Sequence, residues 1–161
     1  MESLPSTIWT QSTTPPWAEA LRRRIERAVA LARRERRRII AGISVPLDES
    51  LDLSAAVLAA RSGGEAAFCF EQPDRDRFAL AGLGTAAVVE ASGADRFAAV
   101  VRECRELAHG ALTDGAEPAW VGGFAFAPEG GRTPEWSGFA PAQLTLPEAV
   151  LRRQGDRATL T

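Results

Sequence analysis

The chain has 161 residues, which is enough for one domain with its own hydrophobic core. Hydrophobic residues make up 45% of it, charged residues 25%, and the net charge is −2. This composition is ordinary for a soluble globular protein and excludes a polyanion binder built from the whole molecule. We find no secretory signal and no apolar run of membrane length, so we expect a cytoplasmic protein without a membrane partner.

The supply of reactive side chains is narrow. All 19 basic residues are arginine, so no lysine can act as a base or form a Schiff base in this chain. Two cysteines and one histidine are too few for a zinc site. Cys104 and His109 do not share a helix face cleanly, which disfavours a Cys–His nucleophile pair. We expect Cys69 and Cys104 to be buried thiols rather than a disulfide.

The N-terminal 38 residues predict an arm and a helix. Residues 1–16 are polar and rich in proline, which indicates a flexible arm. Residues 17–38 predict an arginine-rich helix, capped by Thr14, with Pro15 and Pro16 at its start. At helical spacing, its apolar face carries Leu21, Ile25, Ala28, Val29 and Ala32.

Charge is divided unevenly along the chain. Residues 1–40 hold nine arginines and four acidic residues, a net charge of +5, whereas the remainder holds ten arginines and seventeen acidic residues, a net charge of −7. The basic helix could bind nucleic acid or another polyanion. Alternatively, it packs its apolar face on the body, with its arginines solvated or paired to acidic residues. No aromatic residues interleave with the arginines, so we favour packing and do not expect a nucleic-acid partner.

Residues 39–161 predict a sheet-forming region that completes a single domain over residues 17–161. Hydrophobic alternation and turn residues predict, in chain order, a strand over 39–45 ended by Pro46, a short helix over 48–64, strands over 65–73 and 77–91, a helix over 93–112, a strand over 119–131, a loop with Trp136, and strands over 142–161 with a turn at Gly155–Asp156. We expect Phe97, Val100, Val101, Cys104 and Leu107 to form the apolar face of the second of these helices.

The stretch "FCFEQPDRDRFALAGLG" reads as a β-hairpin. Glu71, Asp74 and Asp76 cluster at its turn, but turns favour Asp for backbone reasons, so a metal site there is the less favoured interpretation. From the residues alone, the chain is an α/β domain without an identifiable active site.

Four segments, taken in order, resemble the N-terminal part of isochorismate synthases, members of the chorismate-utilising family that includes anthranilate and salicylate synthases. The segments are "ISVPLDE", "FCFEQPDRDRFALAGLGTA", "WVGGFAFAP" and "EWSGFAPAQLTLPEAVLRRQGDRATLT", and the resemblance covers Ile39 to Thr161. The matching residues are Phe68, Phe70, Glu71, Gln72, Pro73, Ala81, Gly82, Leu83, Gly84, Gly122, Gly123, Phe124, Ala125, Phe126, Trp136, Phe139, Leu146 and Pro147.

The resemblance implies the N-terminal half of an α/β (α+β) sandwich, with mainly antiparallel sheets and outer helices. It also implies a parent isomerase that converts chorismate to isochorismate with Mg²⁺, for menaquinone or siderophore biosynthesis. In the family, the lysine base, the general-acid glutamate and the Mg²⁺-binding glutamates all follow the segments found here.

We therefore expect no catalytic, cofactor-binding or metal-binding residue in this chain. It would be an inactive scaffold whose partner is the absent C-terminal catalytic domain, with apolar surface that promotes self-association.

Glu71 and Gln72 would close a hairpin, and the final "ATLT" would be half of an incomplete hairpin with unpaired backbone groups. "ISVPLDES" does not reproduce the family's Leu-Leu-Glu-Ser tryptophan motif, so we expect no tryptophan site. A salicylate or anthranilate synthase fragment, or a polyanion-binding module, remains the alternative.

Overall fold

The computed structural model describes residues 15–114, 117–131 and 133–161. Along the chain, its helices and strands are α1 (Pro16–Glu35), β1 (Val45–Leu47), α2 (Leu53–Ala60), β2 (Ala67–Gln72), β3 (Phe78–Leu83), β4 (Ala87–Ala91), α3 (Arg96–His109), β5 (Val121–Phe124), the 3₁₀ helix η1 (Pro134–Trp136), β6 (Ala142–Leu146), β7 (Ala149–Gln154) and β8 (Arg157–Leu160). This mixture of helices and antiparallel strands confirms the predicted α+β fold class.

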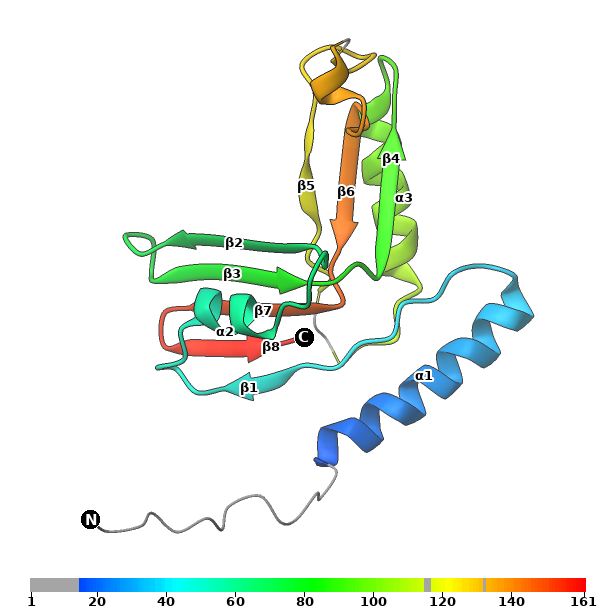
Figure 1. Cartoon of the computed structure of the whole chain (residues 1–161). Helices are drawn as coiled ribbons and strands as arrows, with labels where there is room; N and C mark the ends of the chain where they lie inside the picture. The colour runs from blue at the N-terminus through cyan, green and yellow to red at the C-terminus, as the bar shows by residue number, and fades with distance from the viewer. Residues whose placement is uncertain (1–14, 115–116, 132) are drawn as a thin grey trace, which may run out of the picture.

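Two antiparallel sheets form the frame of the molecule (Figure 1). The larger sheet has five strands in the order β1-β8-β7-β3-β2, and the smaller has three in the order β4-β6-β5. Helix α2 packs on one face of the larger sheet, and α3 packs on one face of the smaller sheet. Each sheet is therefore covered by a helix on only one of its two faces.

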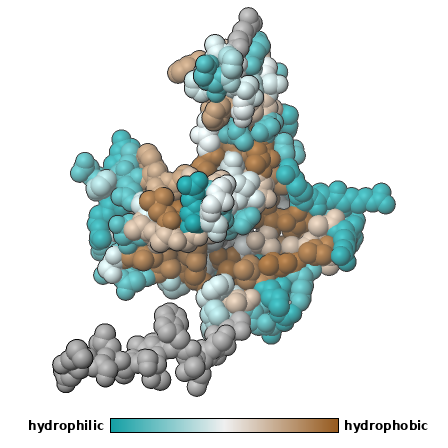
Figure 2. All heavy atoms as spheres, in the orientation of Figure 1, coloured by the Kyte–Doolittle hydropathy of each residue, from teal (hydrophilic) through white to brown (hydrophobic). Residues whose placement is uncertain are grey.

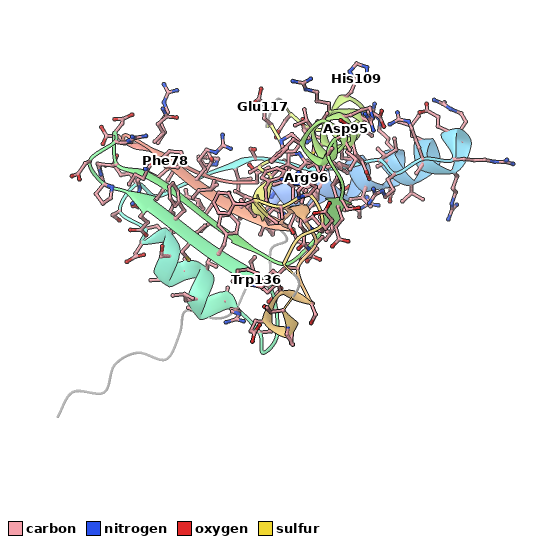
Figure 3. All side chains as sticks on the ribbon, turned by 90° about the horizontal axis from the view of Figure 1, so that it is seen from above. Phe78, Asp95, Arg96, His109, Glu117 and Trp136 are labelled. Atoms are coloured by element: carbon pink, nitrogen blue, oxygen red, sulfur yellow. The ribbon has the colours of Figure 1, made fainter. Side chains whose placement is uncertain are left out.

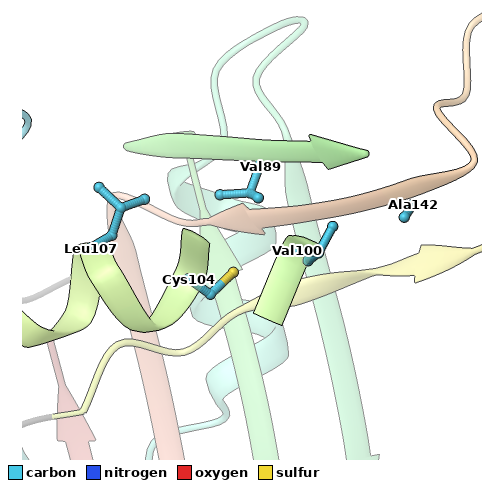
Figure 4. Packing of buried hydrophobic residues seen from close by; sticks show 5 residues of the cluster. All are labelled: Val89, Val100, Cys104, Leu107 and Ala142. Carbon is cyan, nitrogen blue, oxygen red and sulfur yellow. The ribbon is translucent and has the colours of Figure 1, made fainter. Parts of the chain in front are cut away.

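Each helix buries a small cluster of side chains against its sheet. Under α3, the cluster consists of Val89, Val100, Cys104, Leu107 and Ala142 (Figure 4). Under α2, it consists of Leu53, Val57, Ala79 and Ala81. Because side chains alternate between the faces of a strand, the even-numbered positions of β2 and β3 point away from α2.

The chain passes from one sheet to the other at two adjacent places. β3 continues into β4 through Gly84, which has φ of 73°, and β6 continues into β7 through Pro147 and Glu148. The Glu148 N–H donates to the Leu83 carbonyl at 3.0 Å, so the two crossings support each other. The prediction of one strand over 77–91 is wrong, because the left-handed backbone at Gly84 breaks it into strands of different sheets.

The first strand also differs from its prediction. Residues 39–44 do not form a strand, apart from a single parallel bridge between Ala41 and Leu112. β1 instead spans Val45–Leu47 and includes Pro46. Proline is tolerated there because β1 lies at the edge of its sheet, where one side of the strand needs no ladder hydrogen bonds.

The final strand is not half of an incomplete hairpin. β8 pairs with β7 across the Gly155–Asp156 turn, as expected, and it also pairs with β1 on its other side. The prediction of unpaired backbone groups along β8 is therefore wrong. A strand more than 100 residues away in sequence supplies the second ladder, and local pattern carries no signal for such a pairing.

Helix α1 ends at Glu35, three residues before the predicted boundary, and Arg36 takes a left-handed conformation (φ of 52°) at its C-terminus. The predicted arm over residues 1–16 and the Thr14 cap lie almost wholly outside the described residues. Among the described residues, no helix is both long enough and apolar enough to cross a membrane.

Candidate functional site

The hairpin acid Glu71 serves as a link between two elements. It lies on the α2-facing side of β2, where its carboxylate accepts a hydrogen bond from the Ser54 hydroxyl. Gln72, the last residue of β2, pairs with Phe78 at the start of β3. Gln72 thus closes the hairpin, and Glu71 attaches it to α2.

Asp74 and Asp76 lie in the β2–β3 turn, which packs against the β7–β8 turn. The Asp76 carbonyl accepts from the Gly155 N–H at 2.6 Å, and Arg77 pairs with Asp156 at 3.0 Å. Within the described residues, no three or more His, Cys, Asp or Glu side chains form a group that could hold a metal ion. The structure thus brings the turn acids together for turn packing and not as a ligand set.

The Cys104–His109 pair does not form a catalytic unit. Cys104 is buried in the α3 cluster, whereas His109 is exposed at the end of α3 and lies far from Trp136 in Figure 3. Burial, together with the nearby charge of Glu103, raises the pKa of the Cys104 thiol and makes its thiolate less accessible.

Both cysteines are free, but the expectation that Cys69 is buried is wrong, because it is exposed on the edge strand β2.

This difference predicts how the two thiols react. In the native chain at pH 8, a thiol reagent such as DTNB should modify Cys69 at least about 10-fold faster than Cys104, because exposure and thiolate content govern the rate. Stopped-flow absorbance measures the two phases. Cys69→Ser should remove only the fast phase, and a fast phase that survives in this variant would contradict the assignment.

The arginines of and just after α1 are largely paired within the chain. Six of the nine have a carboxylate partner, either on α1 or, for Arg24 and Arg38, on the body at Asp114 (3.8 Å) and Glu103 (2.8 Å). Hydrogen bonds from Arg22 and then Arg23 lower the pKa of Glu19 to about 2. This pairing favours the interpretation in which the arginines are neutralised over the one in which they bind a polyanion.

The apolar face of α1, however, is only partly covered: Leu21 and Ala32 are half-buried. Ile25 is 45% exposed and Val29 is 42% exposed, and Ala28 is the one buried residue among the described positions of this helix. The prediction that this face packs against the body is therefore wrong for Ile25 and Val29 but agrees with the burial of Ala28. In Figure 1, α1 lies beside the sheets and is joined to them by the connection that precedes β1.

A largely apolar groove follows the edge strand β5. One part is a cavity of about 650 Å³ lined by the aromatic rings of Phe124, Phe126, Trp136 and Phe139. The other is a cavity of about 600 Å³ between β5 and the uncovered face of β2 and β3, lined by Phe68, Phe70 and Leu80. Both include Gly122 and Thr145, so we treat them as one feature and call it the β5 groove.

The walls of the β5 groove are aromatic and exposed. The rings of Phe97 and Phe124 lie 4.9 Å apart, and those of Trp136 and Phe139 lie 5.8 Å apart. Phe126 is fully exposed, and none of the lining residues that the structure describes carries a charge. Figure 2 shows hydrophobic side chains gathered where the two sheets meet. Sequence analysis did not recognise this groove, although "GGFAFAP" and "EWSGF" carry its aromatic residues.

Comparison with known proteins adds one finding. The profile of a family described as "Chorismate binding enzyme" matches residues 23–161. No curated protein and no solved structure matches the chain. The matched range contains both sheets, helices α2 and α3 and the whole of the β5 groove. Since this profile spans most of the sequence, the chain belongs to the chorismate-binding enzyme family.

Proposed function

We propose that this chain is the N-terminal scaffold part of an isochorismate synthase, which converts chorismate to isochorismate for menaquinone or siderophore biosynthesis. The observation that carries the proposal is the family match over residues 23–161, taken together with the ordered segments "FCFEQPDRDRFALAGLGTA" and "WVGGFAFAP". The chain by itself would be inactive.

The chemistry explains why a second part is needed. The reaction adds water at one ring carbon of chorismate and removes hydroxide at another, so it requires a base, an acid and a means of stabilising the charge that develops. The sequence contains no lysine to act as the family's base. The described residues also do not fit the Mg²⁺ that the family resemblance implies, because no group of acidic side chains converges on a common point.

In this proposal, the chain contributes structure to the active enzyme. Its two sheets, each covered by a helix on one face only, supply a frame on which a catalytic part packs. The catalytic groups and the Mg²⁺ ligands belong to that part, and the apolar surface of the present chain holds it in place.

The test compares residues 1–161 with the product of the complete reading frame that contains them. Each protein is incubated with chorismate and MgCl₂, and the products are separated by liquid chromatography. We expect isochorismate from the complete product and no turnover above the buffer control from residues 1–161. Turnover by residues 1–161 alone would overturn the scaffold role. Salicylate or anthranilate as the product would replace the isochorismate synthase assignment by the corresponding synthase.

A further inference from the structure

We infer that the β5 groove receives a β-strand of the polypeptide that carries the catalytic residues, and that this strand extends the three-stranded sheet beside β5. The inference rests on the proposed function, because it takes the catalytic part as the partner. It goes further by naming the surface, the backbone groups and the kind of segment involved.

The backbone of β5 presents a free hydrogen-bonding edge. β5 pairs with β6 in the register Val121↔Thr145 to Phe124↔Ala142, and just beyond it the Ala125 N–H donates to the Pro141 carbonyl at 2.8 Å. Hydrogen-bonded and non-hydrogen-bonded pairs alternate along an antiparallel ladder. The N–H and C=O groups of Gly122 and Phe124 therefore point away from β6, towards the open side of β5.

This edge lacks the devices that natural proteins use to protect an exposed strand. Such edges are usually shielded by charged side chains, by proline, by a bulge or by a covering element. β5 has the sequence Val-Gly-Gly-Phe, and the described residues that line the two cavities of the β5 groove carry no charge. An extended, uncharged and largely apolar segment matches both the open ladder and the aromatic walls.

The exposed area of the chain is large enough to accommodate a partner. Its accessible surface is 11,625 Å², whereas a folded monomer of this mass exposes about 7,800 Å². Residues 1–14 could account for at most about 2,300 Å² of this difference, which leaves an excess of about 1,500 Å². A standard interface buries about 800 Å² per partner, so the excess accommodates a stable complex.

A second copy of the chain is a poorer occupant than a strand of the catalytic part. Residues 41–161 carry ten arginines and seventeen acidic residues, so two copies joined through this region would bring two bodies of net charge −7 together. Among the residues that the structure describes, none that lines the groove is basic and could offset this repulsion. A neutral strand meets no such barrier.

Amide hydrogen exchange, followed by NMR, tests the inference at single residues. Residues 1–161 and the complete reading-frame product are compared without chorismate or Mg²⁺. We expect the amides of Gly122 and Phe124 to exchange at least about 100-fold more slowly in the complete product, because an added strand would bond them. The amide of Gly123 points towards β6, so it should be protected in both proteins and serves as the internal control.

A matched pair of variants tests whether the groove is the docking surface. A Cβ added at Gly123 meets no atom within 4 Å, and the same is true of Gly63, which lies outside the groove. In the complete product, Gly123→Lys should reduce the protection of Gly122 and Phe124 at least about 10-fold, because it places a charge against an apolar partner. Gly63→Lys should leave their exchange unchanged.

The remaining outcomes overturn the inference. Equally fast exchange of Gly122 and Phe124 in both proteins would show that no strand binds there, including the case in which the reading frame adds no residue to the 161. Protection in residues 1–161 that rises with protein concentration would identify a second copy as the occupant. The exchange measurement does not depend on catalysis. Protected amides without isochorismate formation would refute only the proposed function. Isochorismate formation with unprotected amides would refute only the docking strand.

Discussion

Replacing Gly122 with alanine is expected to destabilise the chain by about 2–3 kcal/mol, because β5 and β6 leave no room for a side chain there. A Cβ at this position would clash with the Gln143 carbonyl oxygen and lie 3.0 Å from the Cα of Leu144. Both neighbours belong to the backbone of β6, which cannot move without breaking its ladder with β4. Thermal unfolding followed by circular dichroism should show a fall in Tm of roughly 5–10 °C.

Gly123→Ala is the matched control, since the adjacent position has open space around its Cβ. Its free energy of unfolding should stay within about 0.5 kcal/mol of the parent chain. A general loss of glycine flexibility would affect both variants alike. Equal effects at Gly122 and Gly123 would therefore contradict the close approach of β5 to β6.

The second large effect is expected at Arg96, the first residue of α3. Its side chain is only 4% exposed, and its guanidinium donates to the carbonyl oxygens of Ala125 (2.8 Å) and Phe126 (3.1 Å) just beyond β5. It also lies 4.3 Å from the centre of the Phe97 ring. Arg96 thus connects the start of α3 to the end of β5, and it lies between these elements in Figure 3.

Arg96→Ala should lower the free energy of unfolding by about 3 kcal/mol, because it removes charge-assisted hydrogen bonds, a cation–π contact and buried volume together. Urea unfolding followed by tryptophan fluorescence measures the change. Arg96→Met keeps most of the volume, so a loss of about 1 kcal/mol or more should persist if the hydrogen bonds matter. Full recovery in Arg96→Met would show that Arg96 acts by filling space alone.

Arg105→Ala provides the surface control on the same helix. Arg105 is exposed, so its replacement should change the free energy of unfolding by no more than about 0.5 kcal/mol. A loss comparable with that of Arg96→Ala would place the effect in helix propensity and not in the connection to β5.

Local pattern was enough to locate most of the elements. The α2 region carries its own cap, since the Asp52 carboxylate accepts from the Ala55 N–H at 2.8 Å, and α3 shows an apolar stripe and a terminal Gly110. The β2–β3 hairpin was predictable for the same reason: apolar alternation and a charged turn are properties of neighbouring residues. The exposure of Phe97 and Val101 was harder to predict. Both belong to the apolar stripe of α3, yet they remain 48% and 40% exposed.

The candidate site was harder to predict than the elements. The β5 groove is lined by four separate segments: the β2–β3 hairpin, β5 with the residues after it, the loop that contains η1, and β6. Aromatic residues in a single segment look like ordinary core residues. Only their arrangement shows that Phe126 and Trp136 lie at the surface beside a free strand edge.

The sequence by itself determined the α+β class, the hairpin and turn positions, and the chemical limit that no lysine is available in this chain. The tertiary structure decided how the strands divide into two sheets at Gly84 and Pro147, that β8 lies between β7 and β1, and that Ile25 and Val29 of α1 are left exposed. The reason is physical. Helix and turn preferences depend on residues a few positions apart, whereas strand partners and burial depend on segments that meet only when the whole chain has folded.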